Sequence, residues 1–211
     1  FLHDRRSFLI IDMNPGMALI NLVFQTIWKD SDLYHFNEKR FIKVIDDALG
    51  NVSKIEKTVD VLFEKGFKDL FLIGVGGTYS HFLPILFIAG QLSKLPVHAV
   101  QAAEFVLQGN KQFSADSLCV FCSRSGDTRE IVDAVRYCNN AGATTLAFVC
   151  HADTPVCMES THHFVSFAED DHLAECFYLQ LYAFLFRVLM RFGDFPKYGT
   201  FVEQIREITP Y

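Results

Sequence analysis

Two short segments of the sequence gather small residues and hydroxyl groups just before a helical pattern begins. The first is GVGGTYS at residues 74–80, and the second is SRSGDT at residues 123–128. Each follows an apolar run, and the first turn of a helix presents unpaired N–H groups and a partial positive charge. Hydroxyls beside those N–H groups add hydrogen-bond donors, so both segments are typical of anion binding, with phosphate as the usual ligand.

Both segments also have ordinary structural interpretations. GVGGTYS fits a tight turn, and it lacks the final glycine of the dinucleotide-binding motif G-x-G-x-x-G. The chain has no G-x-x-x-x-G-K-[ST] motif, so an ATPase has little support. Ser125 or Thr128, with Glu130 nearby, would also serve as a helix cap. Because capping and phosphate binding use the same N–H groups, the pattern alone leaves both interpretations open.

The elements that position these segments are predicted from apolar periodicity. Apolar residues at steps of three and four predict a helix over residues 38–65, with a possible break at Gly50 and Asn51. Strands are predicted at 69–74, 97–101, 117–122, 144–150 and 162–167, and further helices at 80–93, 128–140 and 170–191. This alternation predicts an α/β fold with a doubly wound, flavodoxin-like, five-stranded parallel sheet. Ligands in such folds bind beyond the carboxyl ends of the strands, where both hydroxyl-rich segments would lie.

Length, composition and net charge limit the classes of function. The chain has 211 residues, half of them hydrophobic, and a net charge of −6, which suits one sizeable domain and argues against nucleic acid as a partner. Six scattered cysteines do not suggest a secreted disulfide framework. Cys119 and Cys122 form a CxxC inside a predicted strand, where residues three apart point to opposite faces. We therefore expect core cysteines and no metal site.

The two ends of the chain differ from the middle. Residues 1–37 are expected to form an N-terminal extension or docking arm. The apolar stretch 8–27 is interrupted by Asp12, Asn14, Pro15 and Gly16, which leaves pieces shorter than the roughly 20 residues that a membrane span needs. No clear cleavage site marks it as a signal peptide. Residues 38–191 are expected to form the main domain, and the tail 192–211 contains a short helix that would lead into a second domain absent from this sequence.

The combination of segments resembles the sugar isomerase (SIS) domain family. That family pairs a G-x-G-x-S/T-like loop with an S-x-S-G-x-T loop, and QAAEF at residues 101–105 lies between the two as it does there. The similarity covers about residues 38–191 and is closest in appearance to fructosamine-6-phosphate deglycases and the isomerase half of glucosamine-6-phosphate synthase. The resemblance implies a cytoplasmic protein that binds a phosphorylated sugar or amino sugar without a cofactor.

The resemblance also implies roles for single residues. It assigns the sugar phosphate to Ser123, Ser125 and Thr128, and contact with the sugar to Thr78, while Gly76 and Gly77 let the backbone approach the ligand. Arg124 stands where a glutamine is common in the family. Its side chain either adds positive charge to the phosphate site or faces the solvent.

Glu104 is the candidate for catalysis. Aldose–ketose isomerisation needs a base, and Glu104 is the outstanding acid in an otherwise apolar segment, where burial would raise its pKa. The alternative is a carboxylate that caps a helix or ties down a loop. Family enzymes usually carry two SIS domains, and their catalytic residues come mainly from the second domain or a neighbouring subunit.

Two functions therefore stay open at this point. The chain is either part of a phosphosugar isomerase or deglycase whose site is completed by a second domain or subunit, or a phosphosugar sensor without turnover. Self-association is expected in both cases, because the helix at 170–191 is apolar on nearly every side. Its surplus apolar surface should be buried against another subunit or the N-terminal arm.

Overall fold

The computed structural model describes residues 38–167 and 173–208, so the predicted N-terminal arm lies outside the described residues. The elements in chain order are α2 (Glu38–Gly50), α3 (Val52–Lys65), β1 (Asp69–Gly74), α4 (Gly77–Leu92), β2 (Val97–Gln101), α5 (Ala102–Gln108), β3 (Ser117–Ser123), α6 (Arg129–Asn140), β4 (Thr144–Val149), α7 (Pro155–Glu159), β5 (His162–Val165), α8 (Leu173–Arg191) and α9 (Tyr198–Ile208).

The five strands form one parallel sheet in the order β2-β1-β3-β4-β5. Gly74 at the end of β1 lies opposite Gln101 at the end of β2. Ser123 at the end of β3 lies opposite Val149, which in turn lies opposite Val165. The strands therefore end at one common edge, and the chain changes direction across the sheet between β1 and β3. The predicted fold class is confirmed.

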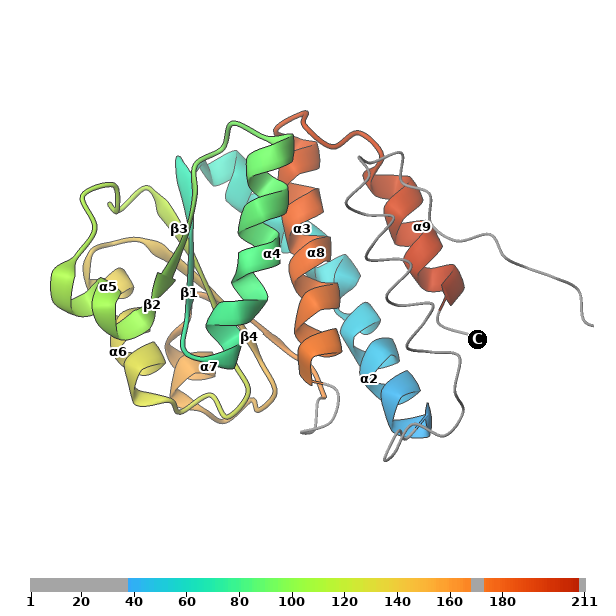
Figure 1. Ribbon diagram of the computed structural model, residues 1–211, viewed down its shortest axis with the longest axis horizontal. Coiled ribbons are helices and arrows are strands. Elements are labelled where there is room, and N and C mark those ends of the chain that lie inside the picture. Colours follow the sequence, from blue (N-terminus) through green and yellow to red (C-terminus); the bar gives the residue numbers. More distant parts are fainter. Residues whose placement is uncertain (1–37, 168–172, 209–211) are drawn as a thin grey trace, which may run out of the picture. The chain divides into compact units, whose positions relative to one another are not determined.

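Two helical layers cover the sheet (Figure 1). Alternate residues of the strands pack in the cores under different layers. Leu70 and Leu72 of β1 belong to the core under α3, α4 and α8, whereas Phe71 belongs to the core under α5, α6 and α7. Cys119 and Cys122 also belong to different cores. The prediction that these two cysteines face opposite ways is thus confirmed.

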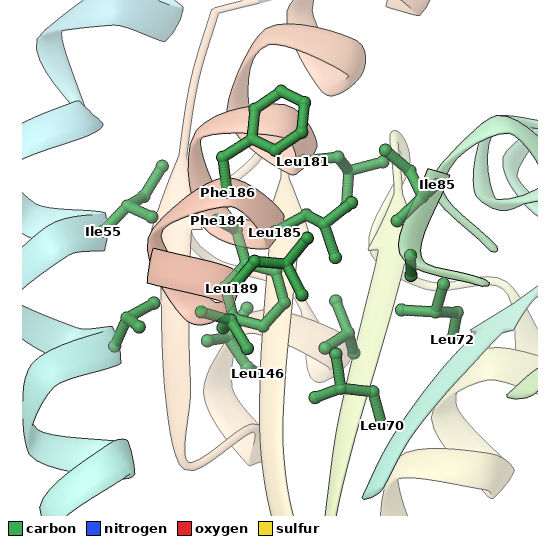
Figure 2. Close-up of a cluster of buried hydrophobic side chains, with 14 of the residues drawn as sticks. Ile55, Leu70, Leu72, Ile85, Leu146, Leu181, Phe184, Leu185, Phe186 and Leu189 are labelled. Atoms are coloured by element: carbon green, nitrogen blue, oxygen red, sulfur yellow. The ribbon is translucent and has the colours of Figure 1, made fainter. Parts of the chain in front are cut away.

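The larger core gathers around α8, where aliphatic and aromatic side chains from the sheet and the neighbouring helices meet (Figure 2). Leu181, Leu185 and Leu189 of α8 lie with Leu70 and Leu146 of the sheet in this cluster (Figure 2). Each of these side chains has no exposed surface. Since a buried leucine contributes roughly 1.5–3 kcal/mol through its burial, this cluster fixes α8 against the sheet.

The outer side of α8 is covered by the tail of the same chain. The ring of Phe186 stacks on Phe195 at a centroid distance of 4.4 Å and meets Phe201 of α9 edge-on at 4.7 Å. Arg187 forms a two-pronged ion pair with Asp60 of α3, at 2.6 and 3.0 Å. The sequence predicts that the surplus apolar surface of α8 packs against another subunit or the N-terminal arm. Around Phe186 this surface is covered instead by α9 and the 192–197 turn of the same chain. Packing of the rest against another subunit or the arm stays a prediction.

The break between α2 and α3 places Asn51 beside the end of β5. The Asn51 side chain donates to the Val165 carbonyl at 3.0 Å and to Ser166 Oγ at 2.6 Å. It therefore ties the junction of α2 and α3 to the end of β5.

Some boundaries differ from the prediction. The third strand extends to Ser123, the fourth ends at Val149 and the fifth ends at Val165. The short helices α5 and α7 were not predicted, because seven and five residues are too few to reveal a 3.6-residue period. No helix within residues 38–167 and 173–208 has the length and apolar character to cross a membrane.

Candidate functional site

The two hydroxyl-rich segments lie next to each other at the carboxyl edge of the sheet. β1 and β3 are neighbours in the sheet, and Ile73 near the end of β1 pairs with Phe121 of β3. The chain therefore leaves both strands side by side, into α4 and into α6 (Figure 1). This is the position where strand order reverses, and open α/β sheets bind ligands there.

The first loop is a tight turn held by Thr78. The Thr78 hydroxyl donates to the Val75 carbonyl at 2.9 Å and accepts from the Val75 N–H at 3.1 Å. Gly76 has a φ of +54°, which favours glycine, and Gly76 and Gly77 are both exposed. Because a threonine hydroxyl has one proton, Thr78 can meet a ligand at this position only as an acceptor.

Gly74 permits the close approach between β1 and the start of α4. A Cβ at Gly74 would lie 2.6 Å from the backbone nitrogen of Tyr79. Any larger residue would push the helix start away from the strand. The glycine therefore brings the first turn of α4 to the edge of the sheet.

The second loop is built around Ser123 and Gly126. Ser123 is buried at the end of β3, and its hydroxyl accepts the Gly126 N–H at 3.0 Å. Gly126 has a φ of +72°, and its carbonyl accepts the Val156 N–H of α7 at 2.9 Å. A Cβ at Gly126 would lie 2.2 Å from Thr154 Oγ1. The hydrogen bond from Gly126 to Ser123 and the contacts with the start of α7 thus fix the conformation of this loop.

Two hydroxyls of this loop stand close together at the start of α6. Ser125 Oγ and Thr128 Oγ1 are 3.4 Å apart, and Ser125 is exposed. Thr128 holds the N-cap position of α6, yet in the described structure its side chain makes no capping hydrogen bond. The capping interpretation of Thr128 is therefore wrong. The pair is spaced to reach oxygens of one anion, beside the N–H groups of the first turn.

Two charged side chains, Arg124 and Glu104, lie at the same edge of the sheet as the two loops. Arg124 is exposed on the second loop, between Ser123 and Ser125. Glu104 lies in the first turn of α5, directly after β2 at the same edge of the sheet. Its side chain is exposed, which corrects the expectation of a buried carboxylate. The apolar neighbours Ala102 and Phe105 face the core, whereas Glu104 points outward.

His81 lies on α4, one turn after Thr78. Its ring meets Tyr178 of α8 edge-on at a centroid distance of 5.0 Å. Burial lowers the pKa of His81, and the charge of Glu175 opposes part of this shift. At neutral pH the imidazole of His81 is therefore largely uncharged, and it packs between the first loop and the start of α8.

A separate hollow of about 550 Å³ lies at the end of β5, two strands from β3. Its lining combines two lysines with two aspartates: Lys39, Ile42, Lys43, Asp46, Asp47, Gly50, Asn51 and Val165. Because the opposite charges balance, this hollow lacks the positive field that a phosphate needs. The loops after β1 and β3 fit an anion better, through their helix starts and hydroxyls.

Sequence reasoning missed the contact between the second loop and α7. The signal was present, because Thr154 followed by Pro155 is a common start for a helix, with proline at its first position. Nothing in the spacing of Gly126 and Thr154 indicated that the two residues touch. That contact follows only from the parallel arrangement of β3 and β4.

Comparison with known proteins was consistent with this geometry. The SIS domain family model matches residues 66–190. Human glutamine–fructose-6-phosphate aminotransferase [isomerizing] 2 is 35% identical over 77 residues, which covers 36% of this chain and 11% of that protein. The fructosamine deglycase FrlB of Bacillus subtilis is 25% identical over 115 residues, which covers 52% of this chain and 35% of that protein.

A solved structure has the same fold. A Bacillus subtilis protein described as a phosphosugar isomerase superposes with a TM-score of 0.69 and 24% identity, covering 78% of this chain and 51% of that one. The chain therefore spans about a tenth to a third of the length of these curated relatives and about half of the structural one.

Proposed function

This chain belongs to the SIS domain family, and we propose that the edge between β1 and β3 binds the phosphate of a phosphorylated sugar or amino sugar. The observation that carries this proposal is the pair of hydroxyls at the start of α6. Ser125 Oγ and Thr128 Oγ1 are 3.4 Å apart, and the Thr128 side chain makes no capping hydrogen bond within the described part of the chain. Together with the first N–H groups of α6 they form a cradle for one phosphate group.

Each loop residue has a proposed part in this site. Ser125 and Thr128 donate to phosphate oxygens, and the charge of Arg124 attracts the anion. The prediction that Ser123 binds the phosphate remains a prediction, since its hydroxyl already accepts the Gly126 N–H under the loop. Gly76 and Gly77 leave room for the sugar beside the first loop, and Thr78 offers an acceptor to a sugar hydroxyl.

We propose that the larger protein acts as a phosphosugar isomerase or deglycase. The names of the relatives support this class, since one is an isomerizing fructose-6-phosphate aminotransferase and another is a fructosamine deglycase. Glu104 is the proposed proton-transfer residue on this chain. It lies after β2, the neighbour of β1, on the edge where both loops open. A second domain or subunit would supply the remaining catalytic groups.

The experiment that tests the binding proposal is calorimetry with fructose 6-phosphate and glucosamine 6-phosphate. Loss of one hydrogen bond to a charged phosphate costs about 1.5–3 kcal/mol, so Ser125→Ala and Thr128→Ala should each weaken binding by roughly tenfold to a hundredfold. Thr200→Ala, an exposed threonine on α9, is the matched control. Unchanged affinity in both loop variants, with folding intact, would refute the proposed site.

We also propose a cellular location for the protein. We propose a cytoplasmic protein, which the six free cysteines support because reducing compartments keep thiols unpaired.

Self-association remains a proposal as well. Light scattering on the purified chain decides it, and a monomer at high micromolar concentration would contradict it.

A further inference from the structure

Cys150 occupies a position that the phosphate-binding proposal does not use. It follows β4 directly, and Val149 at the end of β4 pairs with Ser123 of β3. The next residues, Cys150 and Arg124, therefore leave two neighbouring strands side by side. Cys150 is half-buried, so it lies at the edge of the candidate site without being sealed in the core.

A second thiol lies against it from α8. Cys176 is fully buried and packs with Val44 and Ala48 of α2, and Cys150 packs against the same cluster. The Gln180 side chain donates to the Cys176 carbonyl at 3.1 Å and to Cys176 Sγ at 3.3 Å. Gln180 itself is held by Ser166, whose hydroxyl donates to its Oε1 at 3.0 Å. The Cys176 thiol is thus held within the cluster that Cys150 also contacts.

The surroundings favour the thiolate of Cys150. The pKa of Cys150 is lowered by a hydrogen bond from the Cys176 thiol, and the charge of Arg124 acts in the same direction. Burial and the charge of Asp47 oppose the shift. By contrast, burial raises the pKa of Cys122 and Cys157. Thiolate character and partial exposure together mark reactive cysteines.

We propose that Cys150 and Cys176 are a peroxide-sensitive dithiol at the edge of the sheet. The Cys150 thiolate attacks one oxygen of hydrogen peroxide, the O–O bond breaks, and a proton converts the released hydroxide to water, which leaves Cys150 as a sulfenic acid. The Cys176 sulfur then attacks the Cys150 sulfur. An S–S bond forms, and the sulfenic oxygen leaves as water with the Cys176 proton. Peroxide is reduced by two electrons, and the two thiols are oxidised by two.

A disulfide would connect the end of β4 to α8 beside Arg124. Oxidation removes the negative charge of the Cys150 thiolate from beside Arg124. Since Arg124 belongs to the second loop and its charge then acts on the phosphate alone, we expect phosphosugar binding to become about tenfold tighter. This consequence depends on the proposed function, whereas the dithiol itself does not.

The test uses the whole chain, reduced and then treated with hydrogen peroxide. Digestion without reductant should yield one linked pair of peptides carrying Cys150 and Cys176, and the intact mass should fall by about 2 Da for the two hydrogens lost. Cys157→Ser is the matched control and should form the same link. Cys176→Ser should stop at the sulfenic acid of Cys150, which dimedone traps.

Three results separate the outcomes. Peroxide that leaves Cys150 unmodified, or that oxidises Cys157 as fast in the native protein, overturns the dithiol. Should Cys176→Ser fail to fold, the relative alkylation rates of Cys150 and Cys157 in the native wild type still decide the same question. A disulfide that forms without changing phosphosugar affinity refutes the coupling to the loop, and a reduced protein that binds no phosphosugar refutes the proposed function alone.

Discussion

Replacing Gly126 by alanine probes the loop that carries the candidate site. Gly126 combines a positive φ of +72° with a tight contact, since an added Cβ would lie 2.2 Å from Thr154 Oγ1 and 2.6 Å from Thr154 Cβ. A positive φ costs a non-glycine residue about 1–2 kcal/mol. Thr154 would also have to rotate, which breaks its hydrogen bond to the His151 carbonyl, worth about 0.5–1.5 kcal/mol. We therefore expect Gly126→Ala to lower the free energy of unfolding by about 1.5–3.5 kcal/mol in total.

Urea denaturation measures this loss of unfolding free energy. Two further variants separate its conformational part from its steric part. Gly142 has a φ of +83°, but an added Cβ would meet only Ala115 Cβ at 3.5 Å, an ordinary contact. Gly142→Ala should therefore cost only the conformational part, about 1–2 kcal/mol. Thr154→Gly in the background of Gly126→Ala should recover the steric part, which appears as a coupling energy in a double-mutant cycle.

The reasoning fails if Gly126→Ala is no less stable than Gly142→Ala. That result would mean that the second loop does not contact Thr154 and that the start of α7 does not fix its shape. Loop conformation would then have to be explained without α7, and the hydroxyl spacing of the candidate site would lose its support.

Three further predictions follow from packing, chemistry and titration. Leu185→Ala should destabilise the chain by about 2–5 kcal/mol in urea denaturation because its side chain has no exposed surface, whereas Val61→Ala, 61% exposed, should stay within about 0.5 kcal/mol of the wild type. Glu104→Gln should preserve phosphosugar affinity and lower turnover by roughly 10² to 10⁴ in an assembled enzyme; a collapse of stability would instead make Glu104 structural. Burial lowers the folded-state pKa of His81 below the ordinary 6.5, so its contribution to stability is fully present above pH 6.5 and is lost as pH falls through the folded value. His81→Gln should flatten the fall in unfolding free energy as the pH drops below 6.5. An unchanged slope would contradict a lowered folded-state pKa for His81.

The sheet was predictable because buried parallel strands leave a strong signal in sequence. The run DLFLIG is apolar from Leu70 to Ile73 and ends in glycine, and the helices between the strands have a clear period. The apolar surface of α8 was predictable too, but its partner was not. Helix α9 covers this surface around Phe186. Apolar periodicity predicts which face of a helix is buried, but it does not identify the element that buries it.

The candidate site was predictable in composition and less so in geometry. The hydroxyl-rich loops were visible, yet capping and anion binding need the same residue types at a helix start, so only the observed position of the Thr128 side chain separates them. Glu104 was expected to be buried because its neighbours are apolar. Its segment changes from strand to helix at Ala102, and this change in period turns Glu104 outward.

The most direct test of the central claim is a titration of the isotope-labelled chain with fructose 6-phosphate, followed by backbone amide chemical shifts. The account predicts that the largest shifts fall on Gly76, Gly77 and residues 124–130, that they saturate together, and that fructose without its phosphate does not produce them. Shifts centred on the hollow at the end of β5, around Lys43 and Asn51, would contradict it. So would equal shifts with fructose and fructose 6-phosphate.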